Sequence, residues 1–138
     1  METFTLYKDL IVYCVTAESF PSGILSAHKK LHGILPPVPN RRFFGISHPE
    51  GDTILYKAAA EELTPGEGAR LGLEAFTIKS GKYACIELHD FQKDISKIGD
   101  TFNTLLDLPN IDPEGYCLEC YVSDTVMRCM VPLKSLVG

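Results

Sequence analysis

The chain repeats the order of its predicted elements once, at a constant offset of 71 residues. In each half a strand pattern comes first, an apolar stripe of helical spacing follows, and two further strand patterns end the half. The matched positions are Cys14 with Cys85, Ile24 with Ile95, Ala27 with Ile98, Leu31 with Phe102, Ile34 with Leu105, and Leu35 with Leu106. A repeated unit of this kind buries its apolar face against its neighbour.

The repeat predicts a single α+β domain over residues 1–138, with one repeat at about residues 4–62 and the other at about 72–134. Two β-α-β-β units of this order are expected to form a curved antiparallel sheet or barrel with both helices on one side. A concave surface between the two halves would then serve as a ligand cleft.

In the first half, residues 4–16 read as one strand, and the helix that follows ends at "PPVPN" because proline lacks the amide that a helix interior requires. "RRFFGIS" and "TILYKAAAEEL" read as two strands around the turn "HPEGD". The polar end of this hairpin contains His48, which the offset of 71 places opposite Glu119. The two side chains could face each other, although such a histidine is more often a turn residue.

In the second half, "GLEAFTIK" and "KYACIELH" read as strands joined by a tight Ser-Gly turn. Asp90 is placed to cap the next helix. The apolar stripe of that helix is Phe91, Ile95, Ile98, Phe102, Leu105 and Leu106. "YCLECYV" and "TVMRCMVPL" then read as two strands around "SD".

Composition excludes several classes of protein. The net charge of −5 argues against binding to duplex nucleic acid, which requires clustered basic residues, and only "HKK" and "NRR" are locally basic. The N-terminus lacks the pattern of a signal peptide, and no apolar run approaches the roughly 20 residues needed to span a bilayer. We expect a soluble, cytoplasmic protein with no membrane partner.

Five cysteines are an odd number, and most read as small buried residues in a reducing compartment. Cys117 and Cys120 have the spacing of a zinc site, but on a strand they point to opposite faces and no second pair lies at ligand distance in the sequence. His28 and His32 are four residues apart on a helix, yet a solvated face explains them more simply. We therefore expect neither a metal nor a cofactor.

Glu119 is the residue that most suggests a site, because it interrupts an apolar strand. With period two, Tyr116, Leu118, Cys120 and Val122 share one face of this strand. That apolar face is expected to pack under the helices, so Glu119 would point away from them with Cys117 and Tyr121. The carboxylate could serve as counter-charge for a cationic ligand, or it could be solvated or paired with Arg128.

The second half resembles the GyrI-like small-molecule-binding domain, the effector-binding domain of AraC-type and multidrug-sensing regulators such as Rob and BmrR. The resemblance rests on "IKSGKYACIELHDFQKDISKIGDTFNTLL" and "GYCLECYVSDTVMRCMVPL". The motif positions are Gly81, Tyr83 and Ala84, then His89, then Glu119 and Tyr121, and finally Pro132 and Leu133. "FFGISHPEGDTILYKAAAEE" in the first half matches the family more loosely.

The resemblance implies a bacterial fold of duplicated SHS2 repeats with a ligand cleft, in which the strand glutamate contacts lipophilic cations. The ligand-binding residues expected on this basis are Glu119, Tyr121, Tyr56, Tyr83, Phe44, Phe102 and His48. The family helix often carries a tryptophan, which this chain lacks, and Phe102 is the nearest candidate to replace it. Asp90 stands where the family commonly has glycine.

These residues, together with the resemblance, imply three alternative functions. The first is a stand-alone protein that binds a lipophilic, cationic or aromatic small molecule. The second is a hydrolase of reactive electrophilic compounds, in which Glu119 would act as general base with the help of Tyr121. The third is a protein-interaction module of the gyrase-inhibitor kind, and a protein partner or a homodimer is compatible with it. A haem site, suggested by the related SOUL fold, would need a histidine over an apolar groove.

Overall fold

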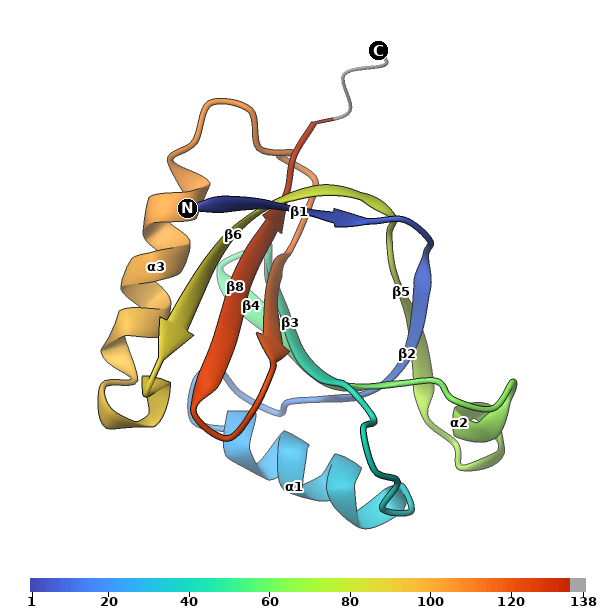
Figure 1. Cartoon of the computed structure of the whole chain (residues 1–138). Coiled ribbons are helices and arrows are strands. Elements are labelled where there is room, and N and C mark those ends of the chain that lie inside the picture. The colour runs from blue at the N-terminus through green and yellow to red at the C-terminus, as the bar shows by residue number, and fades with distance from the viewer. Residues whose placement is uncertain (135–138) are drawn as a thin grey trace. The chain divides into compact units, whose positions relative to one another are not determined.

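The computed structural model describes residues 1–134 of the chain, and the last four residues of the expected domain lie outside the described part. Figure 1 shows strands and helices that alternate along the chain. The elements in order are β1 (Glu2–Leu6), β2 (Leu10–Thr16), α1 (Ile24–Ile34), β3 (Phe43–Glu50), β4 (Thr53–Glu61), α2 (Glu67–Arg70), β5 (Glu74–Ile78), β6 (Gly81–His89), the 3-10 turn η1 (Phe91–Lys93), α3 (Ser96–Leu106), β7 (Cys117–Tyr121) and β8 (Val126–Pro132).

The chain divides into two compact units that have the same internal topology. Unit 1 contains residues 1–8 and the described residues from 80 onward, and unit 2 contains residues 9–79. The strand order is β1-β6-β8-β7 in unit 1 and β5-β2-β4-β3 in unit 2, with antiparallel pairing within each unit. A helix connects β6 to β7 in unit 1 and β2 to β3 in unit 2. The predicted α+β class and the β-α-β-β order of both halves are confirmed.

Each unit has one edge strand in addition to its β-α-β-β core, namely β1 in unit 1 and β5 in unit 2. These strands contradict two of the predictions. Residues 4–16 do not form one strand, because the chain leaves the sheet between Leu6 and Leu10. The predicted hairpin at Ser80 is also wrong, since β5 pairs with β2 whereas β6 pairs with β1 and β8. β1 comes from the first repeat but is the edge strand of unit 1, which contains most of the second repeat. β5 comes from the second repeat but is the edge strand of unit 2, which contains most of the first.

The start of the second helix also differs from the prediction. Asp90 adopts a left-handed conformation with φ of 54°, and its side chain makes no capping hydrogen bond. It precedes the short turn η1, and α3 begins only at Ser96, after Ile95. Ile95 and Leu106, both expected on the apolar stripe, are exposed.

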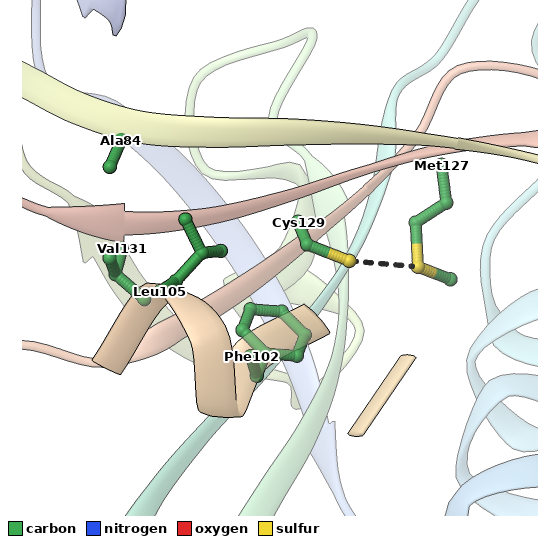
Figure 2. Close-up of a cluster of buried hydrophobic side chains, with 6 residues drawn as sticks. All are labelled: Ala84, Phe102, Leu105, Met127, Cys129 and Val131. Atoms are coloured by element: carbon green, nitrogen blue, oxygen red, sulfur yellow. Dashed lines mark hydrogen bonds between the residues drawn. The ribbon is translucent and has the colours of Figure 1, made fainter. Parts of the chain in front are cut away.

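In unit 1, α3 packs on β6 and β8, and Figure 2 shows the side chains that fill the space beneath it. The buried members of this cluster are Ala84, Phe102, Leu105, Met127, Cys129 and Val131. Alternating residues of β8 supply three of them, so one face of β8 is the helix side of this sheet. Half-buried residues from β7, namely Cys117 and Tyr121, pack against the same cluster.

In unit 2, α1 packs on β4 and β2 through small strand residues. The buried cluster consists of Ala27, Leu31, Leu35, Ala58 and Ala60. Ala58 and Ala60 of β4 have small side chains, so the helix can lie close to the sheet at these positions.

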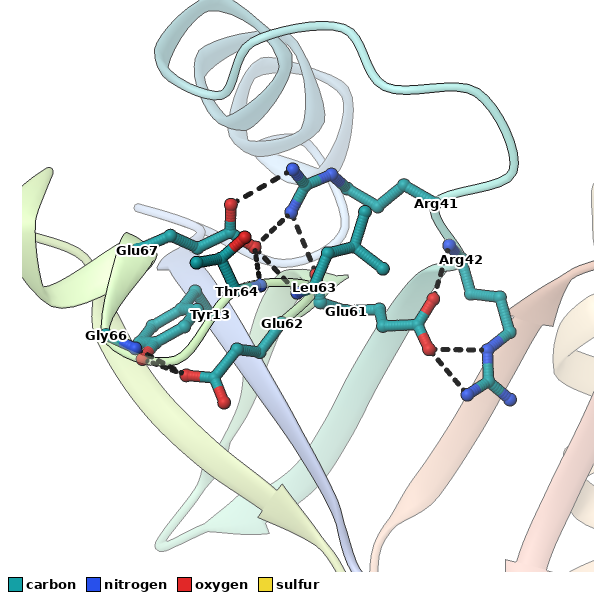
Figure 3. A network of polar contacts seen from close by, with 9 residues as sticks. All are labelled: Tyr13, Arg41, Arg42, Glu61, Glu62, Leu63, Thr64, Gly66 and Glu67. Carbon is teal, nitrogen blue, oxygen red and sulfur yellow. Dashed lines mark hydrogen bonds and ion pairs between the residues drawn. The ribbon is translucent and has the colours of Figure 1, made fainter.

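A buried arginine fixes the segment between β4 and α2, as Figure 3 shows. Arg41 donates to the carbonyl of Glu61 at 2.9 Å and to both carboxylate oxygens of Glu67, at 2.9 and 3.3 Å. The same carboxylate accepts hydrogen bonds from the amides of Leu63 and Thr64. A buried guanidinium is stable only when it is paired in this way, so the network holds the loop in one conformation.

The close packing of Gly68 against Tyr13 gives a direct test of this segment. A β-carbon at Gly68 would lie 2.0 Å from Cγ of Tyr13, whose ring is buried. We expect Gly68→Ala to lower the free energy of unfolding by about 1–3 kcal/mol, measured by chemical denaturation. Gly33→Ala is the control, since nothing lies within 4 Å there and a helical alanine should stabilise by about 0.5–1 kcal/mol. Equal stability of Gly68→Ala and wild type would contradict the packing.

The pairing of Glu67 with Arg41 should appear as acid sensitivity. Hydrogen bonds from Arg41 and from the Leu63 amide lower the pKa of Glu67 from 4.5 to about 2. The folded state therefore binds this proton later than the unfolded state as pH falls, and the stabilisation present above pH 4.5 is lost between about pH 4.5 and 2. We expect Glu67→Gln to be less stable at pH 7 and to lose less stability over this range, measured by urea unfolding at each pH. A wild-type pH profile for the variant would rule out the pairing.

Candidate functional site

Glu119 lies on the helix side of the unit 1 sheet, and this corrects the predicted orientation. In the antiparallel pairing of β7 with β8, Glu119 is opposite Cys129 and Tyr121 is opposite Met127. Directly opposed residues point to the same face, and Cys129 and Met127 both lie in the cluster beneath α3. The face predicted to pack under the helix, which includes Leu118, points the other way.

The carboxylate of Glu119 is half-buried and bonded to its neighbour two residues on. The hydroxyl of Tyr121 donates to Oε1 of Glu119 at 2.6 Å. The ring of Tyr121 contacts that of Phe91, with the centroids 6.2 Å apart and the planes tilted by 51°. Burial, followed by the negative charge of Glu119, raises the pKa of the Cys129 thiol to about 12. A carboxyl group thus lies beside an aromatic pair and a thiol that stays protonated.

Phe102 belongs to the same part of unit 1, because it lies in the cluster against which Tyr121 packs. Three of the predicted site residues, Glu119, Tyr121 and Phe102, are therefore on one side of one sheet. Tyr83 is not with them: it is buried, pairs across the strands with Phe4 and Pro132, and shares a hydrogen bond of 2.6 Å between its hydroxyl and that of Tyr116.

In unit 2, Tyr56 is buried on the helix side, where its hydroxyl lies 2.8 Å from Nε2 of His28. The ring of Phe20 lies 6.2 Å from that of Tyr56. The expectation of a solvated face for His28 is therefore wrong, because its ring is half-buried beside Tyr56. No sequence pattern indicated this cluster. Phe44 is buried on the other face, opposite Ala59.

The predicted correspondence of His48 with Glu119 does not hold. Cys14 of β2 lies opposite Ala59 of β4, and Cys85 of β6 lies opposite Met130 of β8. Cys14 and Cys85 are therefore equivalent, as are Ala59 and Met130, and both pairs are 71 residues apart. Phe44 pairs with Ala59 and Leu118 pairs with Met130, so β3 and β7 correspond at an offset of 74. Glu119 is therefore equivalent to Gly45, because Leu118 follows Cys85 by 33 positions whereas Phe44 follows Cys14 by 30. His48 lies near the end of β3, and its Nδ1 is 3.1 Å from the carbonyl of Pro49.

Within each unit, the basic residue of the central strand lies on the sheet face away from the helix. Arg128 of β8 is bonded to Glu87, and its guanidinium lies 5.8 Å from the ring centroid of Phe4. Lys57 of β4 pairs with Glu74 and lies 5.7 Å from the ring centroid of Phe76. Within β7 and β8, Glu119 is thus the only charged residue on the helix side. The predicted alternative was an ion pair between Glu119 and Arg128. The pairing of β7 with β8 argues against it, because the two side chains lie on opposite faces of the sheet.

Among residues 1–134, no group of three or more histidine, cysteine or acidic side chains could hold a metal ion. Cys117 packs with the cluster beneath α3, whereas Cys120 pairs with Arg128 on the other face. Of the helices in the described part, none is long and apolar enough to cross a membrane.

Three solved structures have the same fold as this chain. They are an integron cassette protein from Vibrio cholerae (TM-score 0.70, 12% identity, covering 96% of this chain and 95% of that one), SAV2435 bound to tetraphenylphosphonium (0.65, 15%, 98% and 94%), and a Staphylococcus aureus MU50 protein described as a bacterial transcription regulation protein (0.60, 13%, 97% and 97%). No protein-family model and no curated protein sequence matches the chain. The similarity is consistent with the fold of the GyrI-like domain.

The environment of His28 can be tested by titration. Burial, with a smaller effect from the charge of His32, lowers the pKa of His28 from 6.5 to about 4. The ring is therefore neutral at pH 7, and the unfolded state binds a proton before the folded state as pH falls below 6.5, so stability falls over this range. We expect the imidazole NMR signals of His28 to titrate near pH 4. A midpoint near 6.5 would show that the ring is solvated instead.

Proposed function

We propose that this protein binds a lipophilic small molecule that carries positive charge, and that Glu119 is the counter-charge. The observation that carries the proposal is the position of Glu119 on the helix side of β7 and β8, among apolar and aromatic side chains. A carboxylate in such surroundings is costly to desolvate, and a ligand cation offsets this cost.

The neighbours of Glu119 suit an aromatic cation. The hydroxyl of Tyr121 donates to the carboxylate and holds it beside the ring. The ring of Phe91 contacts that of Tyr121, whose hydroxyl is bonded to the carboxylate, and aromatic faces attract cations. Because Arg128 is on the opposite face, it does not compete for Glu119 from within the sheet.

The solved structures support the same class of ligand. SAV2435, which has the same fold over nearly its whole length, is bound to tetraphenylphosphonium, a lipophilic cation. The Staphylococcus aureus protein described as a transcription regulation protein suggests that binding could serve as a signal. The fold is shared at only 15% identity or less, so the proposal depends on the side chains of this chain and not on theirs.

In this proposal Tyr121 and Phe102 contact the ligand together with Glu119. Phe44, Tyr56, Tyr83 and His48 stay predictions of ligand contact, as do a cytoplasmic location and a role without direct nucleic-acid binding. The hydrolase alternative would use the same carboxylate as a general base, so turnover of electrophilic esters measured on the same variants separates the two functions.

The test is a calorimetric titration with tetraphenylphosphonium and, as its neutral counterpart, triphenylphosphine oxide. We expect Glu119→Gln to weaken binding of the cation by about 1–3 kcal/mol and to leave binding of the neutral compound unchanged. Glu87→Gln is the matched control, because it removes the same charge from the opposite face of the same sheet. Both variants are first checked for an unchanged melting temperature. If both variants lost the same affinity for the cation, the effect would come from net charge alone, and a specific role for Glu119 would be refuted.

A further inference from the structure

The two edge strands, β1 and β5, have almost the same sequence. Residues 2–6 read Glu-Thr-Phe-Thr-Leu and residues 74–78 read Glu-Ala-Phe-Thr-Ile. Glutamate, phenylalanine, threonine and a large aliphatic residue thus recur at the same positions. The repeat described above extends to the first residues of the chain, but at an offset of 72 and not 71.

The two strands also occupy equivalent places in their units. β1 pairs with β6 so that Glu2 lies opposite Cys85, and β5 pairs with β2 so that Glu74 lies opposite Cys14. Cys85 and Cys14 are themselves equivalent residues of the repeat. Each strand therefore fits, by sequence and by register, the place that the other one fills.

In each unit, a basic side chain from the next strand but one contacts the phenylalanine of the edge strand. Arg128 of β8 reaches across β6 to Phe4, with its guanidinium 5.8 Å from the ring centroid, and Lys57 of β4 reaches across β2 to Phe76, at 5.7 Å. Arg128 and Lys57 lie 71 residues apart and are equivalent. The edge position in each unit thus recognises a strand with phenylalanine at this point through backbone pairing and a cation–π contact.

Each edge strand reaches its place through a short connection. β1 is joined to β2, in unit 2, by Tyr7, Lys8 and Asp9, and the side chain of Tyr7 is 87% exposed. β1 is five residues long and, in the described part of unit 1, pairs with β6 alone. An edge strand that is held by one neighbouring strand and joined to the rest of its chain by a short hinge can be exchanged between identical chains.

We propose that β1 is an exchangeable strand and that its partner is a second copy of this chain. In the exchanged dimer, β1 of each copy leaves its own β6 and pairs with β6 of the other copy, in the same register and under the same Arg128. The contacts of the strand are the same in both states, so the balance between monomer and dimer depends on the hinge, residues 7–9, and on protein concentration. This inference does not depend on the proposed ligand.

A pair of engineered cysteines distinguishes the two states directly. Thr5 and Lys82 are directly opposed in the pairing of β1 with β6, so Thr5→Cys with Lys82→Cys allows a disulfide across this pair. Oxidation of a concentrated sample should give a dimer band on a non-reducing gel if the strand is exchanged. Wild type, with its five native cysteines, and each single variant are the controls. A disulfide that forms only within one chain at every concentration would overturn the proposal.

Two further variants separate the hinge from the strand. Insertion of Gly-Ser-Gly-Ser after Lys8 lengthens and relaxes the hinge, so it should lower the dimer fraction at equilibrium, measured by light scattering. Phe4→Ala weakens the strand equally in both states, so it should leave the dimer fraction unchanged but speed mixing of isotope-labelled with unlabelled copies about tenfold. Phe76→Ala is the matched control, because it weakens β5, which does not exchange. A dimer that mixes faster with Phe76→Ala than with Phe4→Ala would refute exchange through β1.

Discussion

The antiparallel pairing of β7 with β8 determines on which face of the unit 1 sheet Glu119 lies. Because Glu119 is opposite Cys129, it shares a face with the cluster beneath α3, and Leu118 with Met130 takes the other face. A shift of this pairing by one residue would reverse every side chain of β7. The environment of Glu119, its bond to Tyr121 and its separation from Arg128 all follow from this register.

The same pairing rules distribute charge between the faces of both units. The central strands carry their basic residues, Lys57 and Arg128, on the face away from the helix, where each contacts a phenylalanine of an edge strand. The helix side of β7 and β8 has one charge, that of Glu119. The edge strands and the candidate site therefore depend on opposite faces of the same sheets, and a change on one face can leave the other intact.

Much of the fold could be predicted from periodicity and repetition. The helical stripes, the hairpin β3–β4, the hairpin β7–β8 and the α+β class follow from local patterns of apolar residues and turns. The errors concern pairing between distant segments. A Ser-Gly turn at residues 80–81 is a good hairpin signal, yet β5 pairs with β2, because the competing partner is remote in sequence and local turn preference does not report it. The break at residues 7–9 was missed for the same reason.

The sequence by itself determined the repeat, the two helices and the presence of a lone acid at position 119 within an apolar strand, since these depend on side-chain type and spacing. Only the tertiary structure decided which face Glu119 occupies, because both faces of β7 are largely apolar and period two does not say which of them a helix covers. It also decided that Gly45, and not His48, is equivalent to Glu119, since the segment that runs from β6 through α3 into β7 changes the offset from 71 to 74. Strand register is set by hydrogen bonds between segments far apart in the chain, and only the folded chain brings those segments together.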